Sequence, residues 1–267
     1  MTAWRKELGA SYAFAERNFF LTRRTWAWEV AFLVYSVTSA LAISLIGVDQ
    51  QSKSLVLSLM VGAIFWNYLS VVFGWIAETI TVERWEGTLE YTMMAPIRRS
   101  SRLIGQVAYA MVYGLIHTAV IFVVLLLFFP EIDLSHANPT TAVVFMTLGS
   151  LGFVGVGIMA AILPLLYVER GAQMVFVVQS CLLLVSGVYY PITVLPGWMQ
   201  VLAHLSPATY VLDGVRAALT NGTSVADLAY DVVPLVILGV LYVPLGLWAF
   251  GRAETYAKRT GKLKRIG

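Results

Sequence analysis

Long apolar runs separated by short charged stretches dominate the hydrophobic pattern of this chain. A helix needs about 20 mainly apolar residues to cross a bilayer core about 30 Å thick. The pattern therefore predicts an all-α integral membrane protein in which residues 1–267 form a single transmembrane domain. We predict six transmembrane helices, over residues 27–47, 55–77, 103–129, 142–168, 172–195 and 232–251.

Residues 1–26 carry apolar side chains at helical spacing, with Trp4, Leu8, Tyr12 and Phe19 on one stripe and basic residues beside it. This pattern is typical of an amphipathic interface helix, which lies in the headgroup layer with its basic side chains toward anionic lipid. Such a helix either only anchors the chain or also braces a cytoplasmic partner.

The basic residues are distributed unevenly between the two sides that the six spans define. Of the 18 Lys and Arg residues, 16 lie before the first span, between spans two and three, between spans four and five, or after the sixth span. The remaining two, Lys53 and Arg216, lie in the other connections. Because cytoplasmic loops are enriched in Lys and Arg, both termini are predicted to be cytoplasmic, with residues 252–267 as a basic tail.

The composition agrees with a membrane protein and argues against other classes. Hydrophobic residues make up 59% of the chain and charged residues 12%, against roughly 45–50% and about 25% in globular domains. A net charge of +3 does not indicate a nucleic-acid partner. The single cysteine, Cys181, excludes an intrachain disulfide framework and Cys-rich metal sites. We also expect no cleavable signal, because no short apolar region with a small-residue cleavage site follows the first residues.

Residues 78–102 form a connection in which acidic side chains are packed among aromatic and Met side chains. From Glu83 to Glu90 the chain reads ERWEGTLE, and Ala95–Ile97 reads API. Two short helices broken near Gly87 fit this pattern. The apolar content is high for a solvated loop, which indicates a docking surface for a partner.

Two segments together resemble the type-2 permeases of ABC transporters, which are export-type membrane subunits. The stretch just described is similar to the cytoplasmic loop of that family. The segments SGVYYPI at 186–192, LPGWM at 195–199 and SPATY at 206–210 are similar to its extracellular hairpin, which re-enters the membrane between spans five and six. We assign the whole region 196–230 to this outer hairpin and the loop that follows it.

The resemblance implies a homodimer of two permease copies with two cytoplasmic P-loop ATPase subunits, which bind the ATP and Mg²⁺. It also implies a multi-pass protein of the cell membrane, the inner membrane of a bacterium, in contact with lipid. The implied outer-gate residues are Tyr189 and Pro191. The implied ATPase-coupling residues lie in the cytoplasmic loop and are Glu83, Arg84, Gly87, Thr88, Leu89 and Glu90. If this loop is the coupling element, Gly87→Pro or Glu83→Lys should reduce transport and leave expression intact.

A few polar and aromatic side chains near mid-membrane are candidates for lining a substrate path. They are Thr38, Asn67, Phe176, Gln179 and Tyr190. A buried amide usually bonds a neighbouring helix, so the two amides fit packing as well as a path. A path of aromatics and neutral dipoles suits an amphipathic substrate better than a small ion.

Other function classes find less support. No P-loop motif is present, so we expect ATP hydrolysis on a separate subunit and no enzymatic activity in this chain. An ion-coupled carrier usually holds charges near the bilayer centre, where this chain has none, and His117 at mid-span fits a neutral His bonded to a neighbouring helix. The His spacing predicts no metal site. An intramembrane enzyme pairing Ser180 or Ser186 with His117 remains an alternative, although nothing singles out a catalytic residue.

Two cargo classes fit the resemblance. Hydrophobic or amphipathic compounds, such as a drug, an antibiotic or a lipid, are the cargo of the branch that the loop resembles. Lipid-linked polysaccharide is the alternative, but the approach to span one, Arg23–Glu29, lacks the Gly and Pro typical of polysaccharide exporters.

Overall fold

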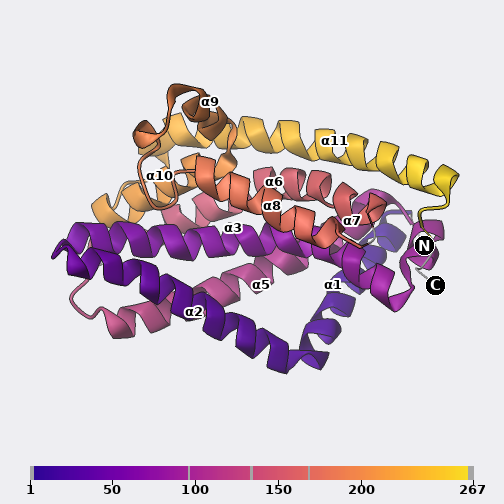
Figure 1. The fold of residues 1–267 in the computed structure, drawn as a ribbon, viewed down its shortest axis with the longest axis horizontal. Coiled ribbons are helices and arrows are strands. Elements are labelled where there is room, and N and C mark those ends of the chain that lie inside the picture. The colour runs from indigo at the N-terminus through magenta and orange to yellow at the C-terminus, as the bar shows by residue number, and fades with distance from the viewer. Residues whose placement is uncertain (1–2, 96, 133–134, 168, 264–267) are drawn as a thin grey trace.

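The computed structural model describes residues 3–95, 97–132, 135–167 and 169–263 (Figure 1). Every regular element within these ranges is a helix, in agreement with the predicted fold class. Two of them are short 3₁₀ helices, η1 (Ile192–Val194) and η2 (Ala226–Leu228). The α-helices are α1 (Ala3–Arg24), α2 (Trp26–Asp49), α3 (Lys53–Glu86), α4 (Leu89–Met94), α5 (Arg99–Phe128), α6 (Pro139–Ala160), α7 (Ile162–Leu166), α8 (Gly171–Val185), α9 (Gly197–Leu205), α10 (Pro207–Asn221) and α11 (Ala229–Thr260).

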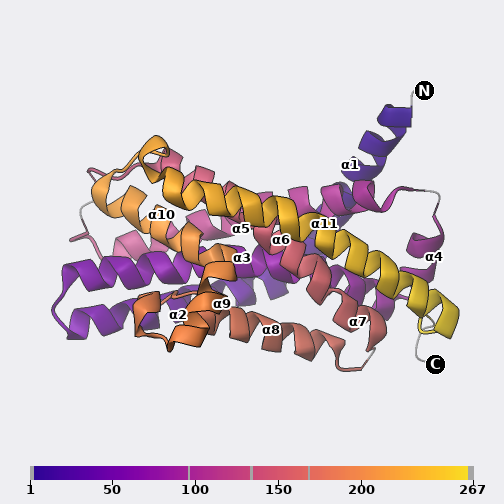
Figure 2. The ribbon, with the colours of Figure 1, turned by 90° about the horizontal axis from the view of Figure 1, so that it is seen from above.

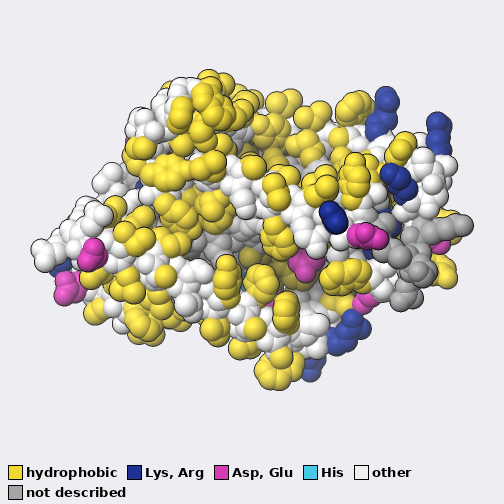
Figure 3. Space-filling model, viewed as in Figure 1, with side chains coloured by type: hydrophobic (Ala, Val, Ile, Leu, Met, Phe, Trp, Pro, Cys, Tyr) yellow, Lys and Arg dark blue, Asp and Glu magenta, His cyan; other side chains and the backbone are white. Residues whose placement is uncertain are grey.

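Five helical segments of this described part are long and apolar enough to cross a membrane: α2, α3, α5, the α6–α7 pair, and α11 with the η2 turn before it. The central segments are α3 and the α6–α7 pair. In the most apolar stretch of each, 67% and 61% of the residues are buried inside the protein. The corresponding shares in α2, α5 and α11 are only 22–28%. Apolar side chains cover much of the face in Figure 3, as expected of a bundle whose solvent is lipid.

The start of α1 and the end of α11 lie at the same end of the bundle (Figures 1 and 2). We call this the basic end, because Lys and Arg side chains gather there in Figure 3. Residues 50–52 and 222–225 lie at the opposite end.

Glycines on α6 let the neighbouring helices approach its backbone. A Cβ atom at Gly149 would lie 2.0 Å from a methyl group of Val211 on α10. One at Gly155 would lie 2.4 Å from the backbone of Tyr242 on α11. Small residues at helix crossings allow this close packing within a membrane.

The helix α3 is longer than the span predicted for it. Residues 78–86, which we predicted as the first part of a loop, continue the helix to Glu86. They contain neither Gly nor Pro, so nothing interrupts the helical hydrogen bonds until Gly87, which takes a left-handed φ of 72°. In the same way α11 continues past Gly251 to Thr260, so the first part of the predicted tail is helical. Residue 96 of the predicted loop and residues 264–267 of the tail lie outside the described ranges.

The fifth predicted span is helical only in its first part, because α8 ends at Val185 rather than at Leu195. Its 15 residues extend for about 22 Å, less than the thickness of a bilayer core. The helix stops where Gly187 takes a left-handed φ of 64°. Arg216 of α10 then binds the backbone carbonyls of Gly187 and Val188, at 3.3 and 2.6 Å.

The region predicted as an outer hairpin and loop, 196–230, contains the helices α9 and α10. One face of α10 is fully buried against α3, α6 and α11 and includes Ala208, Val211, Leu212 and Val215. The apolar residues of this segment therefore extend the core of the bundle, although the segment is too polar overall to read as a span.

Candidate functional site

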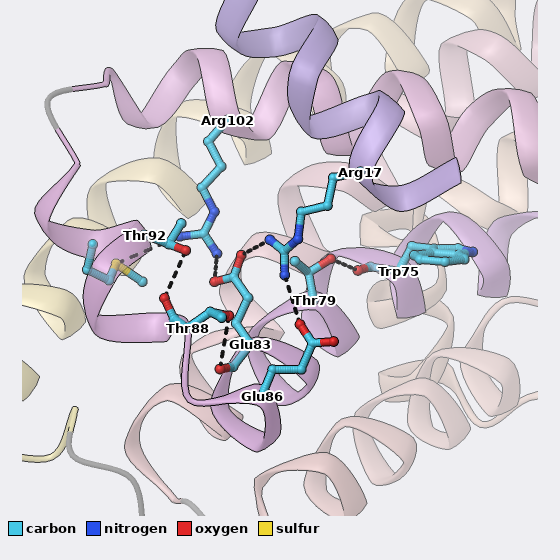
Figure 4. Close-up of polar contacts among 9 residues, drawn as sticks. Arg17, Trp75, Thr79, Glu83, Glu86, Thr88, Thr92 and Arg102 are labelled. Atoms are coloured by element: carbon cyan, nitrogen blue, oxygen red, sulfur yellow. Dashed lines mark hydrogen bonds and ion pairs between the residues drawn. The ribbon is translucent and has the colours of Figure 1, made fainter. Parts of the chain in front are cut away.

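Glu83 is a fully buried carboxylate held between two arginines at the basic end of α3 (Figure 4). Its Oε1 accepts a hydrogen bond from Arg17 Nη1 of α1 at 2.7 Å, and its Oε2 accepts one from Arg102 Nη2 of α5 at 2.7 Å. Removing an ion from water costs several kcal/mol, so a buried carboxylate requires such partners. The three side chains, which we call the Glu83 joint, connect helices that are far apart in sequence.

Glu86 makes a second and more exposed link between α3 and α1. Its two carboxylate oxygens lie 2.9 Å from Arg24 Nη2 and 3.5 Å from Arg17 Nη2. We predicted that the basic residues of the first helix face anionic headgroups. Arg17 and Arg24 are paired with the acids of α3, although the side chain of Arg24 is still 69% exposed.

Arg84 is also buried, but it binds backbone carbonyls. Its Nη2 donates to the carbonyl of Leu165 at 2.6 Å, and its Nη1 donates to the carbonyl of Lys262 at 3.0 Å. The last carbonyls of a helix lack partners within that helix, and Arg84 satisfies one of them at the end of α7. It thereby joins α3 to α7 and to the segment that follows α11.

The turn after α3 is fixed by hydrogen bonds to the backbone (Figure 4). The N–H and the hydroxyl of Thr88 donate to the carbonyl of Glu83, at 2.8 and 3.4 Å. The carbonyl of Thr88 in turn accepts bonds from the N–H and the hydroxyl of Thr92, each at 3.0 Å. Together with the buried side chain of Leu89, these bonds position the short helix α4.

Three large apolar side chains stand exposed around this turn. Trp85 is 72%, Tyr91 76% and Met94 72% exposed. The predicted coupling residues differ in exposure. Glu90 is exposed, and Gly87 and Thr88 are half-buried. The other three, Glu83, Arg84 and Leu89, are buried and cannot contact a partner directly. A partner that docks here would therefore contact a surface, which we call the α3–α4 tip, made of Trp85, Glu90, Tyr91 and Met94.

The helix α1 turns a polar face to the protein and an apolar face outward. The hydroxyl of Ser11 donates to the carbonyl of Ser101 on α5 at 2.8 Å. On the other face, Leu8, Tyr12 and Phe19 of the predicted apolar stripe are 63%, 69% and 55% exposed. Figure 2 shows that the N-terminal part of α1 extends obliquely away from the bundle.

Asn67 bridges α2 and α5 from its place on α3. Its Nδ2 donates to the hydroxyl of Ser36 at 3.0 Å, and its Oδ1 lies 3.2 Å from His117 Nδ1. These contacts agree with the interpretation of both Asn67 and His117 as packing residues. Ser36 was not among the sequence candidates, because a single Ser in an apolar span gives no signal.

The remaining path candidates lie apart from this cluster. Thr38 is exposed on α2, and Phe176 is 64% exposed on α8. Gln179 is half-buried, and the hydroxyl of Tyr190 donates to the carbonyl of Leu184. Within the described ranges no hydrogen bond joins these side chains to Asn67. Of the outer-gate candidates, Tyr189 is half-buried and Pro191 is exposed.

We expect Asn67→Leu to lower the free energy of unfolding by about 0.6–1.7 kcal/mol, the range for hydrogen bonds between membrane helices, since Ser36 and His117 both lose a partner. The midpoint of thermal unfolding in mild detergent measures this effect. The matched control is Gln179→Leu, which removes an amide that makes no hydrogen bond in the described ranges. Equal midpoints for the two variants would contradict the packing role of Asn67.

The described residues contain no group of three or more His, Cys, Asp or Glu side chains that could hold a metal ion. Cys181 is exposed on α8. The polar chemistry of the basic end consists of ion pairs and hydrogen bonds that join helices to one another.

Comparison with known proteins gives two matches. The sequence model of the family described as "ABC-2 type transporter" matches residues 10–220. The chain is also similar to the linearmycin resistance permease protein LnrN of Bacillus subtilis (strain 168), with 28% identity over 153 residues. That alignment covers 57% of this chain and 38% of the length of the relative.

Proposed function

Because this chain belongs to the ABC-2 type transporter family, and so is a membrane subunit of an ABC transporter, we propose that it is the permease of an ATP-driven exporter. Its family implies association with ABC ATPases. In our proposal two such P-loop subunits bind and hydrolyse ATP with Mg²⁺, and this chain moves the cargo without being an enzyme itself.

The observation that carries the coupling mechanism is the position of the Glu83 joint beside the α3–α4 tip. The tip offers exposed aromatic side chains to a partner, and the joint fixes the same turn of α3 to α1 and α5. The helix α3, 34 residues and about 51 Å long in all, runs from there through the centre of the bundle. A displacement of the tip by an ATPase would therefore move the central helix as a rigid rod.

The proposed topology has six crossings, with α8 and the turn after it as the fifth. It places the basic end in the cytoplasm, in line with the distribution of Lys and Arg. The outward apolar stripe of α1 supports an interface helix. The buried face of α10 supports a hairpin that re-enters the membrane from the outer side, where Tyr189 and Pro191 would gate the path.

The proposed path lies between two copies of this chain, in a homodimer. Exposed apolar side chains on α2 and α8, such as Tyr35 and Phe176, support a lipid-like environment along it. The similarity to a permease named for antibiotic resistance supports a hydrophobic or amphipathic cargo such as an antibiotic. Lipid-linked polysaccharide is the second candidate.

A pull-down of the tagged chain in mild detergent, followed by mass spectrometry, tests the exporter proposal. We expect a P-loop ATPase at about one copy per permease. The variant Trp85→Ala/Tyr91→Ala/Met94→Ala should recover at least about tenfold less ATPase with an unchanged unfolding midpoint, because exposed aromatic anchors carry much of the energy of an interface.

The matched control is Val194→Ala/Trp198→Ala/Val201→Ala, which removes equally exposed side chains around α9. Full recovery of ATPase by the tip variant would refute the role of the α3–α4 tip. If no ATPase is recovered from the native chain, even after cross-linking, the exporter proposal fails.

A further inference from the structure

A cavity of about 240 Å³ lies at the basic end, close to the Glu83 joint. It is enclosed by six helices, α1, α3, α4, α5, α6 and α11. Its volume is too small for a whole phospholipid but suits part of one acyl chain. Neither the family nor the coupling mechanism above requires a cavity at this place.

The walls of this cavity change from charged to apolar along its length. One end is lined by Arg98, Arg102 and Lys258, and the other by apolar side chains that include Ile158 and Leu247. Leu247 and Lys258 are eleven residues apart on α11, which is about 16 Å along the helix axis. The charged end is also the exposed one, because the side chains of Arg98 and Lys258 are 76% and 42% exposed. The cavity thus matches an amphiphile whose polar group lies at the surface.

Two donors at the wall lack acceptors. The amide of Gln106, a residue only 4% exposed, makes no hydrogen bond within the described ranges. The Nε of Arg102 is likewise buried without an acceptor there, although Nη2 of the same guanidinium binds Glu83. The Nε atoms of Arg84 and Arg216 are also buried without an acceptor among the described residues, so the argument rests on Gln106. Buried amide donors are mostly paired in folded proteins, and an unpaired one at a cavity wall points to a ligand that supplies an oxygen acceptor.

The open end offers cationic hydrogen-bond donors. Among the described residues that line the cavity, Arg98, Arg102 and Lys258 are cationic and Glu254 is acidic. Arg102 and Lys258 are already paired with Glu83 and Glu254, at 2.7 and 2.6 Å, whereas the exposed Arg98 has only the looser contact of its Nε with Glu7, at 3.6 Å, and so has donors left for an anion. Lys258 also donates to the carbonyl of Met93 on α4, at 3.2 Å, which places α4 in the wall of the cavity.

We propose that this cavity binds an anionic phospholipid of the adjoining leaflet. The phosphate lies at the charged end, near Arg98, Arg102 and Lys258, and one acyl chain extends between the apolar side chains of α3, α6 and α11. Arginine and lysine are the residues that recognise phosphate oxygens. Because Thr92, Met93 and Ala95 form one wall, the bound lipid also supports α4. This support of α4 would affect ATPase coupling only if the proposed function holds, whereas the binding of the lipid does not depend on that function.

Native mass spectrometry of the purified, delipidated chain tests the proposal without any ATPase. We expect phosphatidylglycerol to bind at least about tenfold more tightly than phosphatidylcholine with the same acyl chains. Arg98→Gln, which removes an exposed cation at the open end, should weaken phosphatidylglycerol binding about tenfold, and Gln106→Leu should also weaken it. The matched controls are Arg252→Gln, which removes an exposed cation of α11 outside the cavity, and Gln179→Leu.

Equal binding of the two lipids, or equal losses in Arg98→Gln and Arg252→Gln, would overturn the proposal and leave water or general surface charge as the explanation. Binding of palmitate but not of phosphatidylglycerol would overturn the phospholipid assignment in favour of a fatty-acid carboxylate. Displacement of phosphatidylglycerol by millimolar inorganic phosphate alone would overturn the role of the acyl chain. Since the assay contains only this chain, its failure is distinct from a failure to recover an ATPase.

Discussion

Replacing Glu83 with alanine is expected to lower the free energy of unfolding by about 3–5 kcal/mol, the cost of leaving buried charges without a partner. Glu83 is 0% exposed, and the Arg102 side chain that it binds is only 11% exposed. Without the carboxylate, Arg17 and Arg102 would face each other across a buried gap. The midpoint of thermal unfolding of the purified chain in mild detergent measures the loss, and a transport assay should show reduced activity.

The matched control is Glu90→Ala, which removes an exposed acid of the adjacent helix α4 and should change stability by less than about 0.5 kcal/mol. Replacing all three members of the Glu83 joint with apolar residues of similar size should restore much of the stability, since no buried charge of the joint is then left without a partner. Indistinguishable midpoints for Glu83→Ala and Glu90→Ala would show that the joint does not stabilise the fold.

Burial of Glu83 also changes what we expect of Glu83→Lys. The sequence alone predicts a variant that is expressed normally but does not transport. The structure places the new cation between two arginines, so we expect low expression as well. Selective loss of coupling is better sought at the exposed α3–α4 tip.

Gly62→Ala is expected to lower the free energy of unfolding by about 1–3 kcal/mol, because its methyl group has no room. A Cβ atom at Gly62 would lie 2.2 Å from the carbonyl oxygen of Val188. That oxygen cannot retreat freely, because it accepts the 2.6 Å hydrogen bond from Arg216. The substitution should therefore separate the turn after α8 from α3, which limited proteolysis at residues 186–192 would detect.

The same helix offers a matched control for this substitution. Gly74 has no atom within 4 Å of the position that a Cβ would take. Gly74→Ala should be neutral or stabilise the protein by up to about 1 kcal/mol, because alanine is the better helix former. An unfolding midpoint of Gly62→Ala at or above that of Gly74→Ala would contradict the close approach of α3 to this turn.

Hydropathy and length are sufficient to predict α2, whose bounds differ from the prediction by one or two residues. They fail where a distant residue decides the outcome. The apolar run that forms α8 continues to Leu195, and hydropathy does not register Gly187 and Pro191 within it, where the helix gives way to a turn. The turn is then held by Arg216, which lies on another helix and binds its carbonyls.

The candidate site shows the same limit. The acids of residues 78–90 read as part of a loop because charged residues normally face water. Of these acids only Glu83 is buried, and its burial depends on Arg17 and Arg102, which lie 66 residues before it and 19 residues after it. The pattern therefore located the segment and its apolar character, but not which side chains are internal and which are free for a partner.

The two bonds of Arg84 have a consequence for biosynthesis. Its acceptors, the carbonyls of Leu165 and Lys262, lie 81 and 178 residues later in the chain. At the usual 5–20 residues per second, the ribosome needs roughly 4–16 s to make the first and 9–36 s to make the second. Until Leu165 is made, the guanidinium of a newly inserted α3 has neither partner, and we expect headgroup phosphates to hold it. Closure of this end is then a late maturation step, in which the nascent protein exchanges lipid for its own backbone.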